Sequence, residues 1–94
     1  MLEMIADPAD ADRVRGVVAA LAPLFRAQPG CLALRLDRVE GDEGRHLLLI
    51  EWADIADHRD GFAKSDAFRT WAAAIGPLLR GAPRLTYHRA VLAA

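Results

Sequence analysis

The sequence predicts an α+β fold in which a four-stranded antiparallel sheet carries two helices on one face. Three observations predict it. Residues 31–39 alternate between apolar and polar side chains, as a half-buried strand does. Residues 47–50 are apolar without a break, which indicates a strand covered on both faces. Apolar residues recur at helical spacing in residues 14–25 and 68–79. The resulting order, βαββαβ, is the ferredoxin-like plan.

The first strand and helix are predicted at the beginning of the chain. Residues 2–6 form a short strand, and Asp7-Pro8 then starts a helix, because aspartate caps well and proline suits the first helical position. We expect Pro23 to kink this helix or shorten its last turn, and Gln28-Pro29-Gly30 to end it. The apolar stripe of the helix is Val14, Val17, Val18, Leu21, Leu24 and Phe25.

The central hairpin is predicted from two strands that flank a glycine-containing loop. The strand at residues 31–39 places Leu32, Leu34 and Leu36 on one face. Residues 40–44 form the loop, where glycine permits positive φ. Residues 45–53 form the third strand.

The second helical region and the last strand complete the order. Asp54 caps a helix over residues 55–63, and Ser65 or Asp66 caps again, which implies a break. Gly81-Ala82-Pro83 ends the region, and residues 84–92 form the fourth strand. The stripe of the last helix is Phe68, Trp71, Ala72, Ile75 and Leu79.

The uninterrupted apolar run also predicts an assembly. A strand that alternates needs cover on one face, whereas Leu47, Leu48, Leu49 and Ile50 need cover on both. Two helices in a chain of 94 residues can cover one face of one small sheet. The simplest cover for the opposite face is a second copy of the chain, so we expect a homodimer.

Composition excludes several classes of protein. The formal net charge is −1, and the 12 basic and 13 acidic residues are scattered, so no nucleic-acid partner is expected. No apolar run approaches the length of a membrane span, so no membrane partner is expected either. The single Cys31 excludes an intrachain disulfide. The first ten residues lack the features of a signal peptide. We expect one cytoplasmic domain over residues 1–94.

Several short motifs resemble a known family. Pro29-Gly30-Cys31-Leu32 leads into a strand, a glycine-containing hairpin follows, and Ile50-Glu51-Trp52-Ala53-Asp54 ends the next strand. Further along, Ser65-Asp66-Ala67-Phe68 matches a Ser-x-x-Phe motif. With these motifs the chain resembles the antibiotic biosynthesis monooxygenase (ABM) domain family of the dimeric α/β barrel superfamily, over about residues 2–91.

The resemblance implies a fold, an activity and a partner. Proteins of this family form homodimers in which two sheets pack into a barrel with the helices outside. Its enzymes oxidise aromatic or quinol-like small molecules with dioxygen, and they use no metal, flavin, haem or other cofactor. The deprotonated substrate itself supplies the electrons. The protein supplies an apolar pocket between sheet and helices, a base or hydrogen-bond partners, and exclusion of water.

The chain departs from the family pattern at two positions. Many members carry Glu where Ile50 stands and His where Phe62 stands, and His58 lies one helical turn before Phe62. These departures favour the alternative of a non-catalytic binding or regulatory dimer on the same scaffold. Isomerases also use this scaffold. A haem-degrading role is disfavoured, because the first strand lacks Asn and Phe62 stands where those relatives have Trp.

The candidate catalytic residues are His58, Tyr87 and His88. His58 falls on the inner stripe of its helix and is read as a base or donor, or alternatively as a buried histidine bonded to backbone or to an acid. Tyr87 and His88 alternate on the last strand, so only one of them is expected to enter a pocket. The candidate substrate-binding residues, which can equally serve as packing residues, are Phe62, Phe68, Trp71 and Trp52.

Other polar residues are interpreted structurally. His46 begins the third strand and is expected to be solvated. Arg35 and Arg89 are expected in ion pairs at an interface, with Asp37 or Glu51 as candidate partners for Arg35. Cys31 is expected to be a small packing residue. No metal site is predicted, because the three histidines are isolated in sequence.

Overall fold

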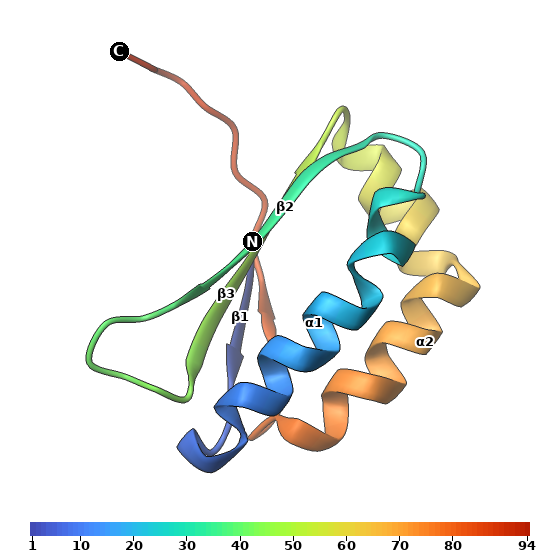
Figure 1. The fold of residues 1–94 in the computed structure, drawn as a ribbon. Helices are drawn as coiled ribbons and strands as arrows, with labels where there is room; N and C mark the ends of the chain where they lie inside the picture. The colour runs from blue at the N-terminus through green and yellow to red at the C-terminus, as the bar shows by residue number, and fades with distance from the viewer.

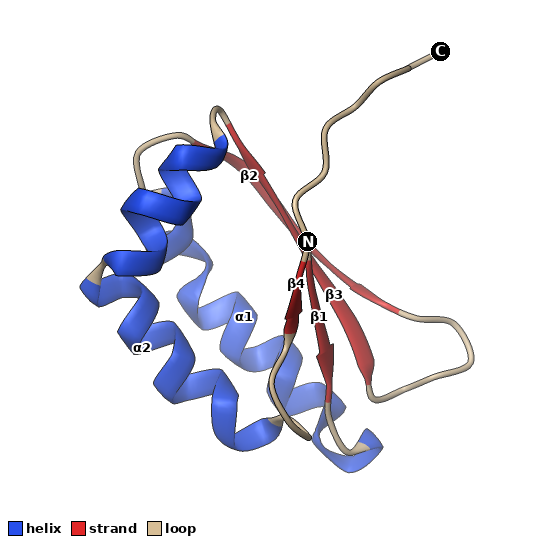
Figure 2. Ribbon diagram, turned by 180° about the vertical axis from the view of Figure 1, so that it is seen from behind, coloured by secondary structure: helices blue, strands red, loops and turns tan.

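The computed structural model describes residues 1–94 and confirms the predicted α+β architecture. The strands are β1 (Leu2–Ile5), β2 (Cys31–Arg38), β3 (Arg45–Trp52) and β4 (Arg84–Leu85). The helices are α1 (Ala11–Arg26) and α2 (Asp66–Ile75). Figures 1 and 2 show both helices on one face of the sheet, with the opposite face uncovered. No helix has both the length and the apolar character needed to cross a membrane.

The four strands form one antiparallel sheet in the order β2-β3-β1-β4. The register aligns Leu36, Leu48, Leu2 and Leu85 across the sheet. Along β3, the buried His46 and Leu48 alternate with the half-buried Leu47 and Leu49. Because side chains alternate between faces, Leu47 and Leu49 lie on the face away from the helices. That face therefore carries leucines that a single chain leaves uncovered.

The core lies between the sheet and the helices. It is a cluster of nine buried hydrophobic residues, and a fully buried side chain of this kind contributes about 2 kcal/mol through the hydrophobic effect. Helix α1 contributes the buried part of its predicted stripe, and α2 contributes Trp71 and Ile75. The members are Met4, Ala6, Val14, Val18, Phe25, Leu48, Phe62, Trp71 and Ile75.

Side-chain caps fix where the helices begin. Oδ1 of Asp7 accepts a hydrogen bond from the backbone N–H of Ala9, and a short 3₁₀ turn (Pro8–Asp10) leads into α1. Oγ of Ser65 accepts a hydrogen bond from the N–H of Phe68 and caps α2. Of the two predicted caps, Ser65 and Asp66, the N-cap is therefore Ser65. Pro23 does not shorten α1, which continues to Arg26. Proline this close to the end of a helix removes only one of its hydrogen bonds.

A β-bulge changes the predicted face of one leucine in β2. Leu34 and Leu36 pack against the core as predicted, but the side chain of Leu32 is 56% exposed. The pairing with β3 shifts between Cys31 and Ala33, so Leu32 has no partner across the ladder. The extra residue breaks the alternation that the sequence pattern assumes.

The predicted fourth strand is much shorter than expected. β4 pairs with β1 through Arg84 and Leu85, and Thr86 adds backbone hydrogen bonds to Met1. Residues 87–92, predicted as strand, have no pairing in the chain. They run past the end of β1 and so have no neighbouring strand. Figure 1 shows the segment extending away from the body of the molecule.

His46 is buried, which corrects the expectation that it is solvated. Its side chain is 1% exposed, and its Nε2 accepts a hydrogen bond from Nε of Arg38 at 3.0 Å. Nε2 is therefore the unprotonated nitrogen, and Nδ1–H faces the carbonyl oxygen of Gly44 at 3.3 Å. Arg38 also donates to the carbonyl of Ala11, so the pair connects the hairpin to α1.

Candidate functional site

The segment between β3 and α2 carries His58 and does not form the regular helix predicted over residues 55–63. Asp54 caps it as predicted, with Oδ1 accepting from the N–H of Ala56. The chain then forms a π-helical turn (Asp57–Gly61) and a 3₁₀ turn (Phe62–Lys64). A π turn has more residues per turn than an α-helix, so the helical pattern gives the wrong rotation for this segment.

The position of this segment is fixed against the end of α1. Gly30 has φ +81°, and a Cβ on it would lie 2.1 Å from Oδ2 of Asp57. The carboxylate therefore occupies space that only glycine leaves free, and the backbone conformation also favours glycine. The same Oδ2 accepts from the N–H of Asp54. The turn before β2 and the turn that presents His58 are thus held together.

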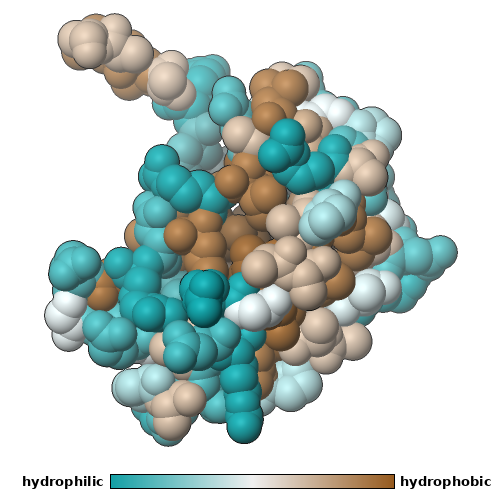
Figure 3. All heavy atoms as spheres, in the orientation of Figure 1, coloured by the Kyte–Doolittle hydropathy of each residue, from teal (hydrophilic) through white to brown (hydrophobic).

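A cavity of about 420 Å³ lies between the sheet and the helices. Of its 17 lining residues, 14 are hydrophobic, and Figure 3 shows the hydrophobic side chains gathered around a hollow between the strands and the helices. The cavity exceeds the roughly 300 Å³ at which small-molecule sites begin. It is large enough for an aromatic ligand of two or three rings.

Aromatic side chains from four elements form the inner wall of the cavity. The ring centroids of Phe25 and Phe62 are 5.0 Å apart, and those of Phe25 and Trp71 are 5.1 Å apart. Trp52 and Phe68 extend the group, with centroids 5.9 and 5.8 Å from that of Phe62. These contacts are in the range of favourable aromatic pairs. All four predicted substrate-binding residues therefore line one cavity.

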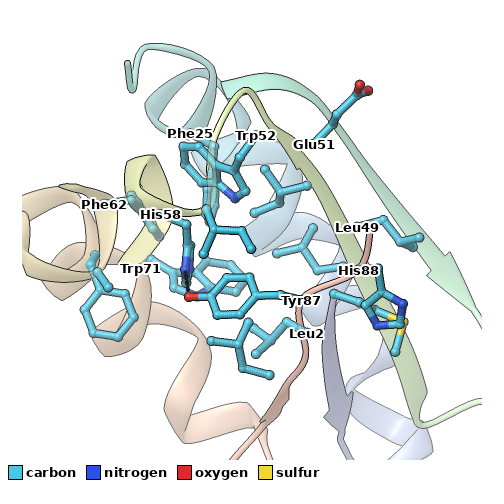
Figure 4. A pocket seen from close by; sticks show the side chains of 17 residues that line it. Leu2, Phe25, Leu49, Glu51, Trp52, His58, Phe62, Trp71, Tyr87 and His88 are labelled. Carbon is cyan, nitrogen blue, oxygen red and sulfur yellow. Dashed lines mark hydrogen bonds between the residues drawn. The ribbon is translucent and has the colours of Figure 1, made fainter. Parts of the chain in front are cut away.

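His58 and Tyr87 form the polar part of the wall. Nδ1 of His58 and Oη of Tyr87 are hydrogen-bonded at 2.7 Å, and Figure 4 shows the hydroxyl directed at the imidazole. The His58 ring also packs 5.5 Å from Trp52 and 5.9 Å from Phe62. Burial, and secondarily the positive charge of the chain's amino terminus, lower the pKa of His58. The imidazole is therefore neutral at pH 7 and can accept a proton.

His88 lines the same cavity at its margin, apart from the His58–Tyr87 pair (Figure 4). Its Nε2 lies 2.7 Å from Oγ1 of Thr86 on the same segment. Both Tyr87 and His88 therefore line the cavity, where we expected only one of them, because the segment that carries them is not a paired strand. The structure brings only Tyr87 to His58. Glu51 is also at the margin, and Figure 4 shows its carboxylate directed away from the cavity.

Sequence reasoning missed several lining residues. Phe25 is 1% exposed and was interpreted only as a packing residue of α1, although it lies at the centre of the aromatic wall. The sequence signal for a cavity role was the position of Phe25 at the C-terminal end of the apolar stripe of α1. Other lining residues, such as Leu2, Leu48, Ile55 and Leu85, come from strands and a loop that meet only in the folded chain.

The remaining polar groups lie elsewhere. Arg35 is paired with Asp37 at 2.9 Å on the uncovered face of the sheet. Cys31 is half-buried, and burial raises the pKa of its thiol, which disfavours the reactive thiolate. No group of three or more His, Cys, Asp or Glu side chains is placed to hold a metal ion.

The sequence model of the antibiotic biosynthesis monooxygenase family matches residues 1–74. The chain belongs to this family. The match includes the aromatic wall and His58 but ends before Tyr87. The wall of this ABM protein that carries Tyr87 and His88 therefore lies outside the matched region.

Solved structures share the fold of this ABM protein. A proposed antibiotic biosynthesis monooxygenase of Caulobacter crescentus is 30% identical, with a TM-score of 0.82 over 97% of this chain and 86% of its own. One from Bordetella bronchiseptica has a TM-score of 0.92 at 24% identity, over 97% and 93% of the two chains, which shows a common fold.

A third structure contains a small molecule. It is the monooxygenase from the gene ActVA-Orf6 of Streptomyces coelicolor in complex with Nanaomycin D, with a TM-score of 0.79 at 19% identity over 99% of this chain and 88% of its own. At this identity it too shows the fold alone.

Among curated proteins, YczJ of Bacillus subtilis is 31% identical over 52 residues. The match spans 55% of this chain and 55% of YczJ. The chain therefore matches about half the length of this relative.

Proposed function

We propose that this ABM protein is a cofactor-independent monooxygenase that oxidises an aromatic, quinol-like small molecule with dioxygen and acts as a homodimer. The observation that carries the proposal is the cavity, whose wall is apolar and aromatic apart from the hydrogen-bonded His58–Tyr87 pair inside it and His88 and Glu51 at its margin. Such a cavity accepts a flat aromatic ring and offers one place for an ionisable hydroxyl. The ligand-containing Streptomyces relative and the family membership support the same substrate class.

In this proposal His58 is the general base. When Nδ1–H of His58 donates to Oη of Tyr87, Nε2 is the unprotonated nitrogen and forms no hydrogen bond within the chain. It then accepts the proton of a bound aromatic hydroxyl, and the resulting anion is electron-rich enough to reduce dioxygen. A ring C–H becomes C=O with one oxygen atom of dioxygen. The other oxygen atom combines with the two hydrogens that the substrate loses and leaves as water.

Tyr87 orients the base in this scheme. Its hydroxyl fixes the ring of His58 through Nδ1, as a third group does for the base in other acid–base sites. The aromatic wall excludes water from the anion, which keeps proton transfer directed to His58. The homodimer is supported by the uncovered Leu47 and Leu49 on the outer face of the sheet.

Oxygen uptake with a panel of dihydroxynaphthalenes and anthrones tests the proposal. We expect uptake above the buffer rate, and about 100-fold less with His58→Gln, because general bases contribute at this scale. Tyr87→Phe should lower the rate less than His58→Gln does. The control is Arg59→Gln, since Arg59 is exposed, pairs with Asp60 and does not line the cavity.

Two outcomes contradict the monooxygenase. Uptake at the buffer rate with every compound, and no ligand-dependent shift in Tm, overturns both catalysis and binding of this class. A shift in Tm without uptake overturns catalysis and supports the alternative of a non-catalytic binding or regulatory dimer. The substitution of the family's usual Glu and His by Ile50 and Phe62 is the observation that favours this alternative.

A further inference from the structure

The sheet has a gap beside the start of β1. β1 begins at Leu2, which pairs with Leu48 of β3, whereas β3 continues as far as Trp52. Residues 49–52 therefore have no neighbouring strand on the side of β1. With no backbone pairing at this point, side chains alone border the opening between the two faces of the sheet.

The aromatic cavity reaches this gap. Among its lining residues, Ile50 belongs to the inner face of the sheet, where it packs against the core, while its neighbours Leu49 and Glu51 belong to the outer face. A cavity confined to the space between sheet and helices would be lined from the inner face alone. Figure 4 shows Leu49 and His88 at the side of the cavity opposite Phe62. The cavity is therefore open toward the outer face of the sheet at this point.

A second, smaller cavity of about 260 Å³ begins at the same place. It shares Met1 and His88 with the aromatic cavity, and its other lining residues are Glu3, Arg84 and Thr86. Glu3 and Arg84 are register partners on β1 and β4, and they alternate with residues of the inner face, so this cavity lies on the outer face. Of its five lining residues only Met1 is hydrophobic. An apolar cavity and a polar cavity thus meet at the gap.

Arg84 is the charged group without a partner in the polar cavity. The acidic residue beside it, Glu3, is paired with Arg45 at 3.3 Å, whereas Arg84 forms no ion pair in the chain. Nε2 of His88 lies 2.7 Å from Oγ1 of Thr86. When the hydroxyl donates to Nε2, the proton of the imidazole is on Nδ1, which can donate to a ligand. A guanidinium with an N–H donor nearby is suited to bind a carboxylate.

We infer that the substrate carries a carboxylate at the end remote from its reacting hydroxyl, and that Arg84 binds this group. The inference rests on the proposed function and narrows its substrate class to aromatic hydroxy acids. The rings occupy the aromatic cavity with the hydroxyl at His58, and the acid passes through the gap to Arg84. In an extended chain, Arg84 and Tyr87 are about 10 Å apart, so the two polar groups of the substrate lie at opposite ends.

The pairing gives selectivity because a carboxylate is costly to remove from water without a cation beside it. In the proposed homodimer, the outer face meets the second copy. The polar cavity is then shielded from water, which strengthens the attraction between Arg84 and the carboxylate. Arg84 is therefore a specificity-determining residue that takes no part in the proton transfer at His58.

Binding of matched acids and esters tests the inference. 6-Hydroxy-2-naphthoic acid carries its carboxyl group at the opposite end from the hydroxyl, and its methyl ester has nearly the same shape without the charge. We expect the acid to bind the wild-type protein about tenfold more tightly than the ester in isothermal titration calorimetry, the gain of a charge-assisted hydrogen bond in a partly exposed site. 3-Hydroxy-2-naphthoic acid, whose two groups are adjacent, should gain nothing over its own methyl ester.

Substitution of Arg84 tests the assignment of the acid site. Arg84→Gln should bind the acid no more tightly than the ester, whereas Arg84→Lys should retain part of the preference. The matched control is Arg15→Gln, because Arg15 is exposed on α1 and lines neither cavity. The preference of the wild-type protein for the acid should also decrease as salt is added, since salt screens a partly exposed ion pair. Circular dichroism verifies that each variant is folded.

The outcomes separate this inference from the proposed function. Equal affinities of acid and ester for the wild-type protein overturn the inference, and so does a preference for the acid that persists in Arg84→Gln. Oxygen uptake with neutral naphthols alongside either result leaves the proposed function intact. Arg84-dependent binding of the acid without oxygen uptake supports the acid site while the proposed chemistry fails. A protein that binds none of these compounds overturns both.

Discussion

At the scale of single residues, the hydrogen-bond partners of each buried histidine determine whether its role is structural or chemical. His46 and His58 both have lowered pKa values, with burial as the main cause. His46 accepts from Arg38 and faces the Gly44 carbonyl, so it has a structural role, whereas His58 faces a cavity. Sequence position alone did not separate them, because the arginine that buries His46 comes from the neighbouring strand.

The burial of His46 makes stability depend on pH. A histidine whose pKa is lowered in the folded state binds fewer protons than in the unfolded state. Its stabilising contribution is complete above the unfolded pKa of about 6.5 and is lost as pH falls below it. We expect the free energy of unfolding, measured in urea, to fall between pH 6.5 and pH 5.

His46→Gln should remove part of this pH dependence, because glutamine can still accept from Arg38 but does not titrate. His58 also has a lowered pKa, so some dependence remains. An unchanged slope in His46→Gln would show that the buried imidazole is not responsible.

At the scale of elements, the sequence predicted what depends on local periodicity and capping. The strands β1 to β3, both helices and the caps Asp7, Asp54 and Ser65 follow from patterns within a few residues. The π turn, the bulge at Leu32 and the short β4 were not predicted. Each of these depends on which neighbour the backbone meets, and a pattern of apolar residues does not contain that information.

The cap of α2 gives a prediction at this scale. Oγ of Ser65 accepts from the N–H of Phe68 and donates to the carbonyl oxygen of Phe62 at 2.6 Å. Ser65→Ala should lower the free energy of unfolding by about 1 kcal/mol, the usual cost of losing an N-cap. Ser65→Asp retains the acceptor and should recover most of that loss in the same chemical denaturation experiment. Equal stability of all three proteins would contradict the capping role.

At the scale of the whole molecule, the sheet separates two tasks. Its inner face encloses the cavity against the helices, and its outer face carries Leu47 and Leu49 among charged residues. The four aromatic residues predicted to bind substrate, Trp52, Phe62, Phe68 and Trp71, line the same cavity. Which of Tyr87 and His88 approaches His58 depended on the course of the C-terminal segment, and the pattern left that open.

The outer face gives the prediction for assembly. Leu47 lies between Glu3 and Asp37 on the neighbouring strands and does not line the cavity. Leu47→Asp places a third carboxylate among these groups and should abolish the dimer, because an unpaired charge is costly to bury. Leu47→Met should remain a dimer. Sedimentation velocity with circular dichroism separates dissociation from unfolding, and a dimeric Leu47→Asp of unchanged affinity would exclude this face as the interface.

Because Asp57–Gly61 forms a π turn, the orientation of the cavity side chains depends on the number of residues in this segment. Loss of one residue there would restore the tighter spacing of an α-helix and rotate the side chains that follow by about 100°. A relative with a deletion after His58 would therefore direct the side chain at the place of Phe62 differently relative to His58, without any substitution in the aromatic wall. Insertions and deletions in this loop are thus as able as point mutations to diversify the chemistry of the scaffold.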